Sequence, residues 1–410
     1  MRVLLISANT EQINMPVLPL GLACVAEATQ KVGHEVKLIN MMAAKDTTAV
    51  IEKALRIFEP EVIGISVRNV DDQNMKDTRF LLRPVKEFIT DCRRLSNAPI
   101  VLGGAGYSIY PQSALEYLEA DMGIQGEGEK AFVSLLERLK KQDDLSGVPG
   151  LYLRDQGAQA TVRPVKNLDD CPLPPPRAHE WIPASMKEKK IWVPFQTRRG
   201  CPMDCSYCST STIEGRNLRR RSPDRVVEMM ARYAEAGLRH FIFVDNTFNL
   251  PPSYARALCD RIIASGLDIS WNGIVYPLML DEELVEKMAR AGCKGISLGS
   301  ESGSQKILKS LNKKFQKKEV RQTADLFKRY GIQRMGFLLF GGPGENKETV
   351  TESLEFTDSL DLDSVKVTMG IRIYPYTALA RTAIREKVIS PDDNLLLPKF
   401  YMANGLEDWL

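Results

Sequence analysis

The sequence Arg199-Gly200-Cys201-Pro202-Met203-Asp204-Cys205-Ser206-Tyr207-Cys208 brings three cysteines together within eight residues, shortly after the apolar run Ile191–Phe195. Cysteine thiolates are the usual ligands of iron–sulfur clusters. Three cysteines separated by three residues and then by two can bind three irons of a four-iron cluster and leave the fourth iron open. Spacings this short force the intervening backbone to curl around a compact object, with Gly200 relieving crowding at its entrance.

A structural zinc site and a set of buried free thiols are the two alternatives for these cysteines. Zinc would need a fourth cysteine or histidine nearby, and the nearest histidines, His179 and His240, are distant in the sequence. Buried free thiols are common in proteins, but three of them within eight residues are improbable by chance. The spacing therefore favours a cluster.

The cysteine pattern resembles that of the radical S-adenosylmethionine (SAM) enzymes, including the aromatic Tyr207 just before the last cysteine. This resemblance implies that Cys201, Cys205 and Cys208 hold a 4Fe-4S cluster. It also implies that SAM chelates the open iron and that the reduced cluster cleaves SAM to a 5′-deoxyadenosyl radical. The electron would come from an external donor such as flavodoxin or ferredoxin.

Composition predicts a soluble protein of two or three domains. The chain has 410 residues, of which 44% are hydrophobic and 26% charged, and this length exceeds one ordinary core. No apolar run approaches the roughly 18–20 residues that span a bilayer. The N-terminus shows no signal-peptide cleavage pattern. We therefore expect a cytoplasmic protein without a membrane span.

Charge and cysteine usage exclude other classes. Lys and Arg total 55 against 52 Asp and Glu, a net charge of +3, so no electrostatic argument favours nucleic acid as a partner. Eight cysteines in a cytoplasmic chain indicate ligands and core residues rather than disulfides.

Residues 1–145 alternate β-branched runs with amphipathic stretches, which predicts a Rossmann-like, doubly wound parallel sheet. The expected strands are Val3–Ile6, Glu35–Ile39, Val62–Val67, Pro99–Leu102 and Met122–Ile124. Ligands of such sheets bind beyond the carboxyl ends of the strands. The residues expected there are Asn9, Ser66, Arg68, Asn69, Gly103, Gly104, Gly126 and Glu127.

Glycines at consecutive strand ends either let the backbone approach a large flat ligand or form tight turns, and the residues alone leave both readings open. The segments Pro19–Leu22, Gly33–Val36, Gly103-Gly104 and Gly126–Glu129 together resemble the cobalamin-binding domain of cobalamin-dependent radical SAM enzymes. The resemblance covers residues 1–145 and implies that the strand-end residues bind cobalamin.

One departure concerns the lower face of the cobalt. Many cobalamin-binding domains supply a histidine ligand from an Asp-x-His-x-x-Gly segment, but residues 9–17 contain no histidine. We interpret His34 as structural and expect the loop after the third strand, with Arg68 or Asn69, to lie nearest the lower face. A weak lower ligand would make cobalamin easier to methylate and methylcobalamin easier to use.

Residues 146–190 form a proline-rich linker with little periodicity. Gly150–Leu153 suggests a small hairpin strand. We expect Trp181 to pack between domains, and His179 has no clear assignment.

Residues 191–385 predict a partial (β/α)6 TIM-type barrel, and residues 386–410 a short C-terminal tail. The expected strands are Ile191–Thr197, His240–Asp245, Ile269–Ile274, Lys294–Leu298, Met335–Phe340 and Val365–Ile371. Ser222-Pro223-Asp224 has the pattern of a capped helix start. Barrels of this type place their chemistry at the carboxyl ends of the strands.

Further motifs follow these strands and resemble radical SAM elements. Asp245-Asn246-Thr247 corresponds to the segment that holds the SAM amino group. Ser300 and Glu301, within Gly299–Gly303, correspond to the element near the ribose and methionine moiety, and Gly342, within Gly341–Glu345, to the element near the adenine. Tyr376 stands where relatives often carry glycine, which suggests a narrower or more aromatic substrate pocket.

Other conspicuous residues have structural interpretations. Arg219–Arg221 is expected to be solvated or paired with acids, and Lys313-Lys314 to belong to an exposed helix entrance. The remaining cysteines are interpreted as small core or linker residues: Cys24, Cys92, Cys171, Cys259 and Cys293.

The resemblance implies a cobalamin-dependent radical SAM methyltransferase that uses a 4Fe-4S cluster, SAM and cobalamin to methylate an unactivated carbon of a small molecule or lipid. A cyclase or rearrangement enzyme with the same cofactors is the alternative. Methylthiotransferases need three further N-terminal cysteines, whereas residues 1–145 offer only Cys24 and Cys92. A non-catalytic corrinoid carrier conflicts with the intact cysteine loop.

Overall fold

The structure is a computed structural model that describes residues 1–10, 18–44, 46–176 and 191–409. The roles expected for Trp181 and His179 fall outside these residues. The chain divides into two compact units. The first comprises Met1–Asp72, Thr78–Ile191 and Thr212–Glu214, and the second comprises Gln73–Asp77, Trp192–Ser211 and Gly215–Leu410.

The first unit contains a seven-stranded sheet with the order β2-β1-β3-β4-β5-β6-β7. Its strands are β1 (Arg2–Ser7), β2 (Glu35–Asn40), β3 (Val62–Ser66), β4 (Ile100–Gly103), β5 (Met122–Ile124), β6 (Leu151–Leu153) and β7 (Gly157–Ala158). The first five pair in parallel, and β6 and β7 extend the sheet as an antiparallel hairpin. The five strands and the hairpin expected from the sequence are therefore confirmed.

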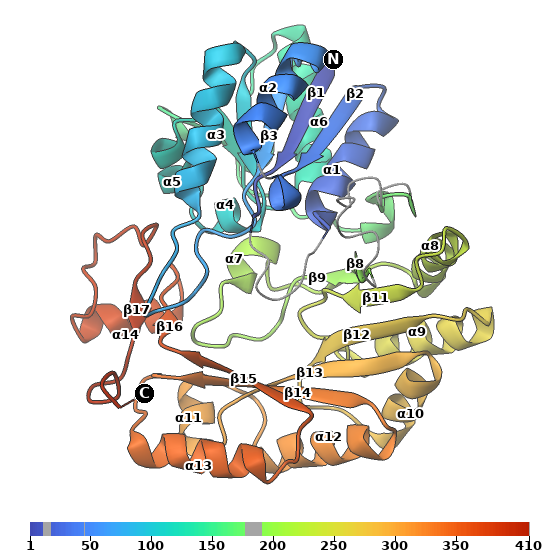
Figure 1. Ribbon diagram of the computed structural model, residues 1–410, viewed down its shortest axis with the longest axis vertical. Coiled ribbons are helices and arrows are strands. Elements are labelled where there is room, and N and C mark those ends of the chain that lie inside the picture. The colour runs from blue at the N-terminus through green and yellow to red at the C-terminus, as the bar shows by residue number, and fades with distance from the viewer. Residues whose placement is uncertain (11–17, 45, 177–190, 410) are drawn as a thin grey trace. The chain divides into compact units, whose positions relative to one another are not determined.

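Helices cover both faces of this sheet (Figure 1). On one face α1 (Leu20–Lys31) packs against α6 (Gly128–Lys141), and on the other α2 (Thr47–Phe58) and α5 (Pro111–Leu118) both contact α3 (Leu82–Leu95). The remaining short helices are η1 (Met41–Ala43), α4 (Ala105–Ile109) and η2 (Leu168–Asp170). Apolar residues recur at helical spacing on the buried faces, so a core forms on each side of the sheet, as a doubly wound fold requires.

The second unit contains a six-stranded parallel sheet in which spatial order follows chain order. Its strands are β8 (Val193–Phe195), β11 (His240–Phe243), β12 (Ser270–Val275), β13 (Cys293–Glu301), β14 (Gln333–Phe340) and β15 (Ser364–Met369). Because β8 and β15 are the two edges of the sheet, the barrel is partial, as expected.

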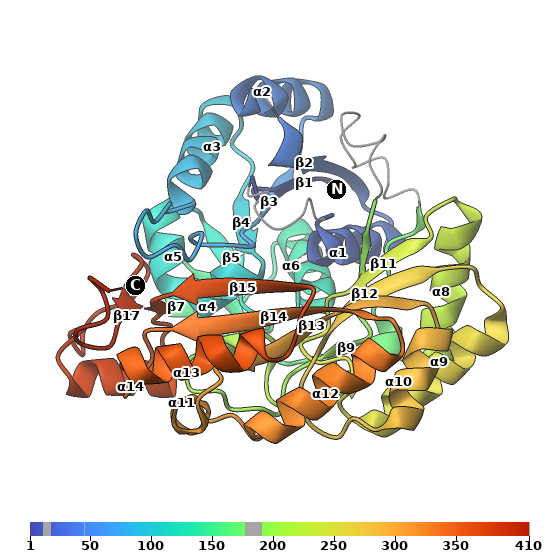
Figure 2. The same cartoon turned by 60° about the horizontal axis from the view of Figure 1, so that its bottom comes forward.

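Helices connect these strands along one side of the sheet (Figure 2). They are α8 (Pro223–Glu235), α9 (Pro252–Ser265), α10 (Glu282–Arg290), α11 (Gln305–Ser310), α12 (Lys317–Arg329) and α13 (Lys347–Asp358). The shorter α14 (Ala378–Arg385) also belongs to this unit, whereas the residues of α7 (Thr210–Glu214) are divided between the two units. The predicted start of α8 is confirmed, since Ser222 accepts the Arg225 backbone N–H and Pro223 opens the helix.

Two small antiparallel pairs complete the second unit. β9 (Arg198–Arg199) pairs with β10 (Arg219–Arg220), and β16 (Ile371–Arg372) pairs with β17 (Phe400–Tyr401). After β17 the chain also contributes to the core, where Ala403 and Leu406 pack with residues of β14 and α13. Ala403 and Leu406 are thus part of the core of the second unit.

A cluster of aromatic side chains fills the space between strands and helices in the second unit. Trp271 is fully buried, and its ring centroid lies 5.1 Å from that of Phe243 and 4.5 Å from that of Phe248. Its indole N–H donates to the Ala291 carbonyl oxygen at 2.8 Å. Among the described residues, no helix combines the length and apolar character that crossing a bilayer requires.

We predict that Trp271→Ala destabilises the second unit by about 3–5 kcal/mol, because it leaves a cavity that the packed rings cannot fill. Trp409→Ala is the control, since Trp409 is 42% exposed and its removal opens no cavity. Urea unfolding monitored by circular dichroism measures both variants. Equal unfolding midpoints for the two would contradict the proposed packing role.

Candidate active site

The cysteine loop lies between β9 and α7, at the carboxyl side of β8. Its backbone is hydrogen-bonded to three separate parts of the second unit. The Cys201 N–H donates to the Gly215 carbonyl at 3.1 Å and the Ser206 N–H to the Leu311 carbonyl at 3.0 Å, while the Ser206 carbonyl accepts the Leu379 N–H at 2.8 Å. The loop is therefore a fixed part of the fold.

Gly200 is required by the entrance to this loop. Its φ of +89° lies in the left-handed region, and a Cβ at this position would lie 2.2 Å from the Asn217 carbonyl oxygen. Any other residue would force β9 and β10 apart. The crowding inferred from the sequence is thus real.

The donor set fits an iron–sulfur cluster. Cys201, Cys205 and Cys208 are all free of disulfides. Within the described residues, no three His, Cys, Asp or Glu side chains converge closely enough to hold one metal ion. A cluster does not need such convergence, because each cysteine binds a different iron. Burial raises the pKa of the Cys205 thiol, and the nearby Lys313 ammonium opposes this rise.

The burial of Lys313 differs from the expectation based on the sequence. Lys313 was expected at an exposed helix entrance, but its side chain is only 4% exposed. Its ammonium group donates to the Tyr207 hydroxyl at 3.0 Å and to the Glu301 carboxylate at 3.1 Å. Burial alone lowers the pKa of Lys313, but the Glu301 carboxylate and Tyr207 more than offset this and hold the pKa well above its usual range. The residue is therefore a buried, charged lysine beside the cysteine loop.

Glu301 ends β13 in an unusual conformation. Its φ is +61°, which is uncommon for a residue other than glycine. The pairing register between β13 and β14 shifts between Leu298 and Glu301, and such irregularities re-aim side chains at the ends of strands. Here the shift accompanies the contact between Glu301 and Lys313. The neighbouring Ser300 is buried, and its hydroxyl donates to the Phe337 carbonyl at 2.9 Å.

Asp245, at the end of β11, is fully engaged with the chain that follows β8. Its carboxylate accepts the Thr197 N–H at 2.8 Å, the Thr197 hydroxyl at 2.6 Å and the Arg198 N–H at 3.1 Å. It also forms an ion pair with the Arg198 guanidinium at 3.3 Å, where both side chains are almost inaccessible. This geometry indicates a positioning role for Asp245 at the entrance to the cysteine loop. The predicted contact with the SAM amino group stays a prediction.

The residues after Asp245 lie close to the cysteine loop. The Thr210 hydroxyl donates to the Asn246 side chain at 3.5 Å and lies 3.2 Å from the Cys208 sulfur. Thr247 is buried. The segment Asn246-Thr247 therefore reaches the loop through Thr210.

The glycine loop after β14 is shaped by Glu345. Its buried carboxylate accepts the Gly341 N–H at 2.5 Å and the Gly342 N–H at 3.0 Å. Burial raises the pKa of Glu345. The sequence motif placed Gly342 at the site but did not reveal that Glu345 holds it.

Tyr376 is 84% exposed and its φ is +64°, a conformation that glycine adopts without strain. Its expected effect on a substrate pocket stays a prediction. The Tyr376 ring points largely to solvent.

Two buried arginines, Arg198 and Arg221, support the segments on either side of the cysteine loop. Arg221 was expected to be solvated or paired with acids; it is only 1% exposed, as is Arg198. The Arg221 backbone donates to the Thr197 carbonyl at 2.9 Å and accepts from the Tyr254 hydroxyl at 2.8 Å. The Arg198 guanidinium donates to the Leu250 carbonyl at 2.6 Å. Nothing in the local sequence distinguishes these arginines from exposed ones.

In the first unit, the predicted cobalamin residues gather at one edge of the sheet. β1, β3, β4 and β5 run parallel, so their carboxyl ends meet there. The residues that follow these ends are Asn9, Ser66, Arg68, Asn69, Gly103, Gly104, Gly126 and Glu127.

At two positions of this edge, close packing leaves no room for a side chain, which explains the glycine. A Cβ on Gly104 would lie 2.5 Å from the Val67 carbonyl oxygen, and one on Gly126 would lie 2.9 Å from Val162. The Glu127 carboxylate accepts the Val165 N–H at 2.7 Å. Tight turns are thus present, and the contacts with a flat ligand stay a prediction.

His34 lies at the opposite, amino edge of this sheet, immediately before β2. Its Nδ1 is 3.3 Å from the N-terminal amino group, and burial, followed by that positive charge, lowers its pKa. A residue at the amino edge cannot reach a ligand at the carboxyl edge. The structural interpretation of His34 fits this position.

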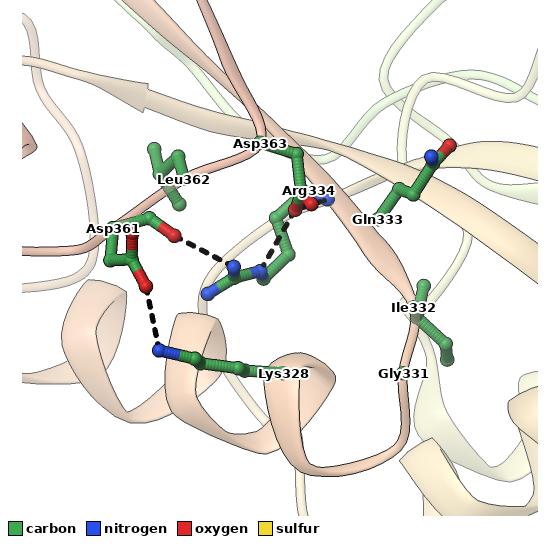
Figure 3. Close-up of a pocket in the computed structure, with 8 residues that line it drawn as sticks. All are labelled: Lys328, Gly331, Ile332, Gln333, Arg334, Asp361, Leu362 and Asp363. Carbon is green, nitrogen blue, oxygen red and sulfur yellow. Dashed lines mark hydrogen bonds and ion pairs between the residues drawn. The ribbon is translucent and has the colours of Figure 1, made fainter.

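A pocket of about 390 Å³ lies at the amino edge of the second sheet (Figure 3). Its charged groups are paired, with Lys328 2.7 Å from Asp361 and Arg334 3.2 Å from Asp363. Barrels of this type carry out chemistry at the opposite, carboxyl edge. The pocket is therefore separate from the candidate active site.

Comparisons with known proteins agree with this arrangement. A model of the radical SAM superfamily matches residues 196–357, and a model of the B12 binding domain matches residues 6–136. An uncharacterized methyltransferase of Pyrococcus horikoshii is 29% identical over 402 residues, which cover 95% of this chain and 84% of the relative. Tryptophan 2-C-methyltransferase of Streptomyces laurentii is 24% identical over 439 residues, which cover 91% of this chain and 73% of that enzyme.

The fold is shared with a solved structure. The radical S-adenosylmethionine methyltransferase TsrM from Kitasatospora setae, with tryptophan and a SAM analogue bound, matches with a TM-score of 0.87 at 23% identity. The match covers 100% of this chain and 86% of TsrM. At this identity the likeness establishes the fold.

We predict that Asp245→Asn destabilises the second unit by about 3–5 kcal/mol, because it leaves the buried Arg198 without its counter-charge. It should also loosen the entrance to the cysteine loop and lower iron retention. Asp268→Asn is the matched control, since Asp268 pairs with Arg239 at 3.1 Å and its side chain is 93% exposed. Chemical unfolding measures the stability, and iron analysis measures the iron retention. An Asp245→Asn variant as stable as Asp268→Asn would refute the positioning role.

Proposed function

We propose that this chain is a cobalamin-dependent radical SAM methyltransferase that acts on an unactivated carbon of a small molecule or lipid. The observation that carries the proposal is a rigidly held loop of three free cysteines at the carboxyl side of a partial barrel, in a chain whose first unit matches the B12 binding domain. The two methyltransferase relatives, which align with more than nine tenths of this chain, support it.

Three groups supply the difficult chemistry in this proposal. When bound, the 4Fe-4S cluster and SAM supply a 5′-deoxyadenosyl radical that removes a substrate hydrogen atom, and cobalamin supplies the methyl group. The chain's own residues bind and orient these groups. Cys201, Cys205 and Cys208 hold the cluster. Backbone hydrogen bonds with Gly215, Leu311 and Leu379 keep their loop in place.

The residues at the strand ends of the second unit bind SAM. We assign Asn246, Thr247, Ser300, Glu301 and Gly342 to this role. Tyr207 and Lys313 hold Glu301 in position, and Glu345 holds Gly342. Asp245 acts through Thr197 and Arg198, whose backbone leads into the cysteine loop.

The carboxyl edge of the first unit binds cobalamin in this proposal. Gly103, Gly104 and Gly126 present backbone without side chains, while Arg68 and Asn69 lie in the loop after β3. We propose that Arg68 and Asn69 in this loop, and not His34, would lie next to the cobalt of bound cobalamin. The position of His34 at the amino edge supports this.

The domain boundaries and partners are part of the same proposal. Residues 1–145 form the cobalamin-binding domain, 146–190 the linker, 191–385 the barrel and 386–410 the tail, and the division between the compact units after Ile191 supports the main boundary. A flavodoxin or ferredoxin provides the electron. The net charge of +3 gives nucleic acid no electrostatic advantage as a partner.

We predict that the reconstituted enzyme releases both S-adenosylhomocysteine and 5′-deoxyadenosine, because one SAM methylates cobalamin and a second yields the radical. Cys205→Ala should lower bound iron and abolish 5′-deoxyadenosine, whereas Cys259→Ala, which removes a buried thiol from α9, should keep both. Chromatography and iron analysis provide the readouts. Release of 5′-deoxyadenosine without S-adenosylhomocysteine would instead indicate cyclisation or rearrangement.

A second prediction concerns the cobalt. The electron paramagnetic resonance spectrum of the cob(II)alamin-loaded enzyme should lack nitrogen hyperfine splitting from a histidine. His34→Gln should leave the spectrum and the bound cobalamin unchanged, because His34 lies at the amino edge. A histidine signal in the native enzyme would disprove the histidine-free lower face.

A further inference from the structure

Lys313 sits in a cage of aromatic rings. Its ammonium nitrogen lies 5.3 Å from the ring centroid of Tyr207, 5.8 Å from that of Tyr276 and 6.0 Å from that of Phe315. Cation–π contacts of this kind stabilise a charge where water is excluded. Together with Glu301 and the Tyr207 hydroxyl, the rings enclose the charge.

The segment around Lys313 is built to keep the side chain there. The Asn312 side-chain amide donates to the Asp204 carbonyl in the cysteine loop at 2.9 Å. The Lys314 N–H donates to the Tyr276 hydroxyl at 2.9 Å, and Phe315 is buried edge-on against Tyr276 with ring centroids 5.0 Å apart. The position of the ammonium relative to the loop is therefore fixed from both sides.

Stability does not explain this arrangement. Removing a lysine and a glutamate from water has a desolvation penalty that often exceeds their attraction, so a buried ion pair is weak evidence for a stabilising role. The Lys313 and Glu301 side chains are only 4% and 16% exposed. Away from water, however, the field of a fixed charge is much stronger than at the surface.

The pair presents its positive end to the cysteine loop. Tyr207, which accepts the hydrogen bond from Lys313, lies between Cys205 and Cys208 in the chain. The positive charge of Lys313 is therefore held next to the segment that carries both cysteines.

We infer that Lys313 is a redox-tuning residue: its buried positive charge beside the cysteine loop raises the reduction potential of the cluster. The negative charge of Glu301 makes this increase smaller. Reduction adds one electron to the cluster, so a nearby fixed cation favours the reduced state, and the potential of such clusters depends on surrounding charge. This inference rests on the proposed function, because it requires a cluster on Cys201, Cys205 and Cys208.

The test compares reduction potentials of variants that change one charge each. Lys313→Met removes the cation, Lys313→Arg keeps it, and Glu301→Gln removes the counter-charge. Lys314→Met is the matched control, because Lys314 is the adjacent lysine, its side chain is 47% exposed, and it pairs with Asp204 of the same loop at 3.4 Å. Redox titration of the anaerobically purified protein without SAM, followed by electron paramagnetic resonance, measures the cluster itself.

At the ambient potential where the native cluster is half reduced, Lys313→Met should lower the ratio of reduced to oxidised cluster at least about tenfold, which is about 59 mV for one electron. Glu301→Gln should raise the ratio. Lys313→Arg and Lys314→Met should stay close to the native ratio. A purely structural role for Lys313 would not produce opposite shifts from the two members of one ion pair.

The outcomes separate the inference from the proposed function. A native protein without iron or a cluster signal would overturn the proposed function itself. A native cluster combined with an unchanged ratio in Lys313→Met, or with shifts of the same sign in Lys313→Met and Glu301→Gln, would overturn the inference alone. If Lys313→Met fails to fold, the upward shift in Glu301→Gln decides the question, and its absence counts against the inference.

Discussion

The rest of the second unit depends on one constraint, the fixed path of the backbone through the cysteine loop. Three cysteines within eight residues leave the chain little freedom, and backbone hydrogen bonds with Gly215, Leu311 and Leu379 remove most of what remains. Gly200 allows the entrance because a side chain there would collide with Asn217. Since parallel strands deliver their carboxyl ends to the same edge, the residues after β11, β13 and β14 meet the loop without any long connection.

Buried charge is concentrated around this loop. Asp245 pairs with Arg198, Lys313 with Glu301, and the Glu345 carboxylate holds two glycine N–H groups. Each burial carries a desolvation penalty that well-packed apolar residues would avoid. Each of these buried charges fixes the position of a loop, a strand end or an ammonium group. The paired charges at the amino edge, in contrast, lie at a partly open pocket and hold β14 to β15.

In the first unit, glycines at the carboxyl edge have a packing role of their own. Gly104 and Gly126 are needed by the packing of their own loops, because a Cβ would strike Val67 or Val162. The match to the B12 binding domain predicts that the same carboxyl edge binds a flat ligand, and this contact stays a prediction. Turn formation and ligand approach are therefore compatible interpretations of one pattern.

The sequence by itself determined the features that depend on neighbouring residues: the cysteine spacing, the alternation of strands and helices in both units, and the Ser222 cap of α8. These follow from local periodicity and turn chemistry, so they can be read along the chain. Only the tertiary structure decided which charges are buried. Lys313 meets Tyr207 across 106 positions of sequence, and Asp245 meets Thr197 across 48. No local pattern marks such residues, because their burial is set by side chains that folding brings to them from distant strands and helices.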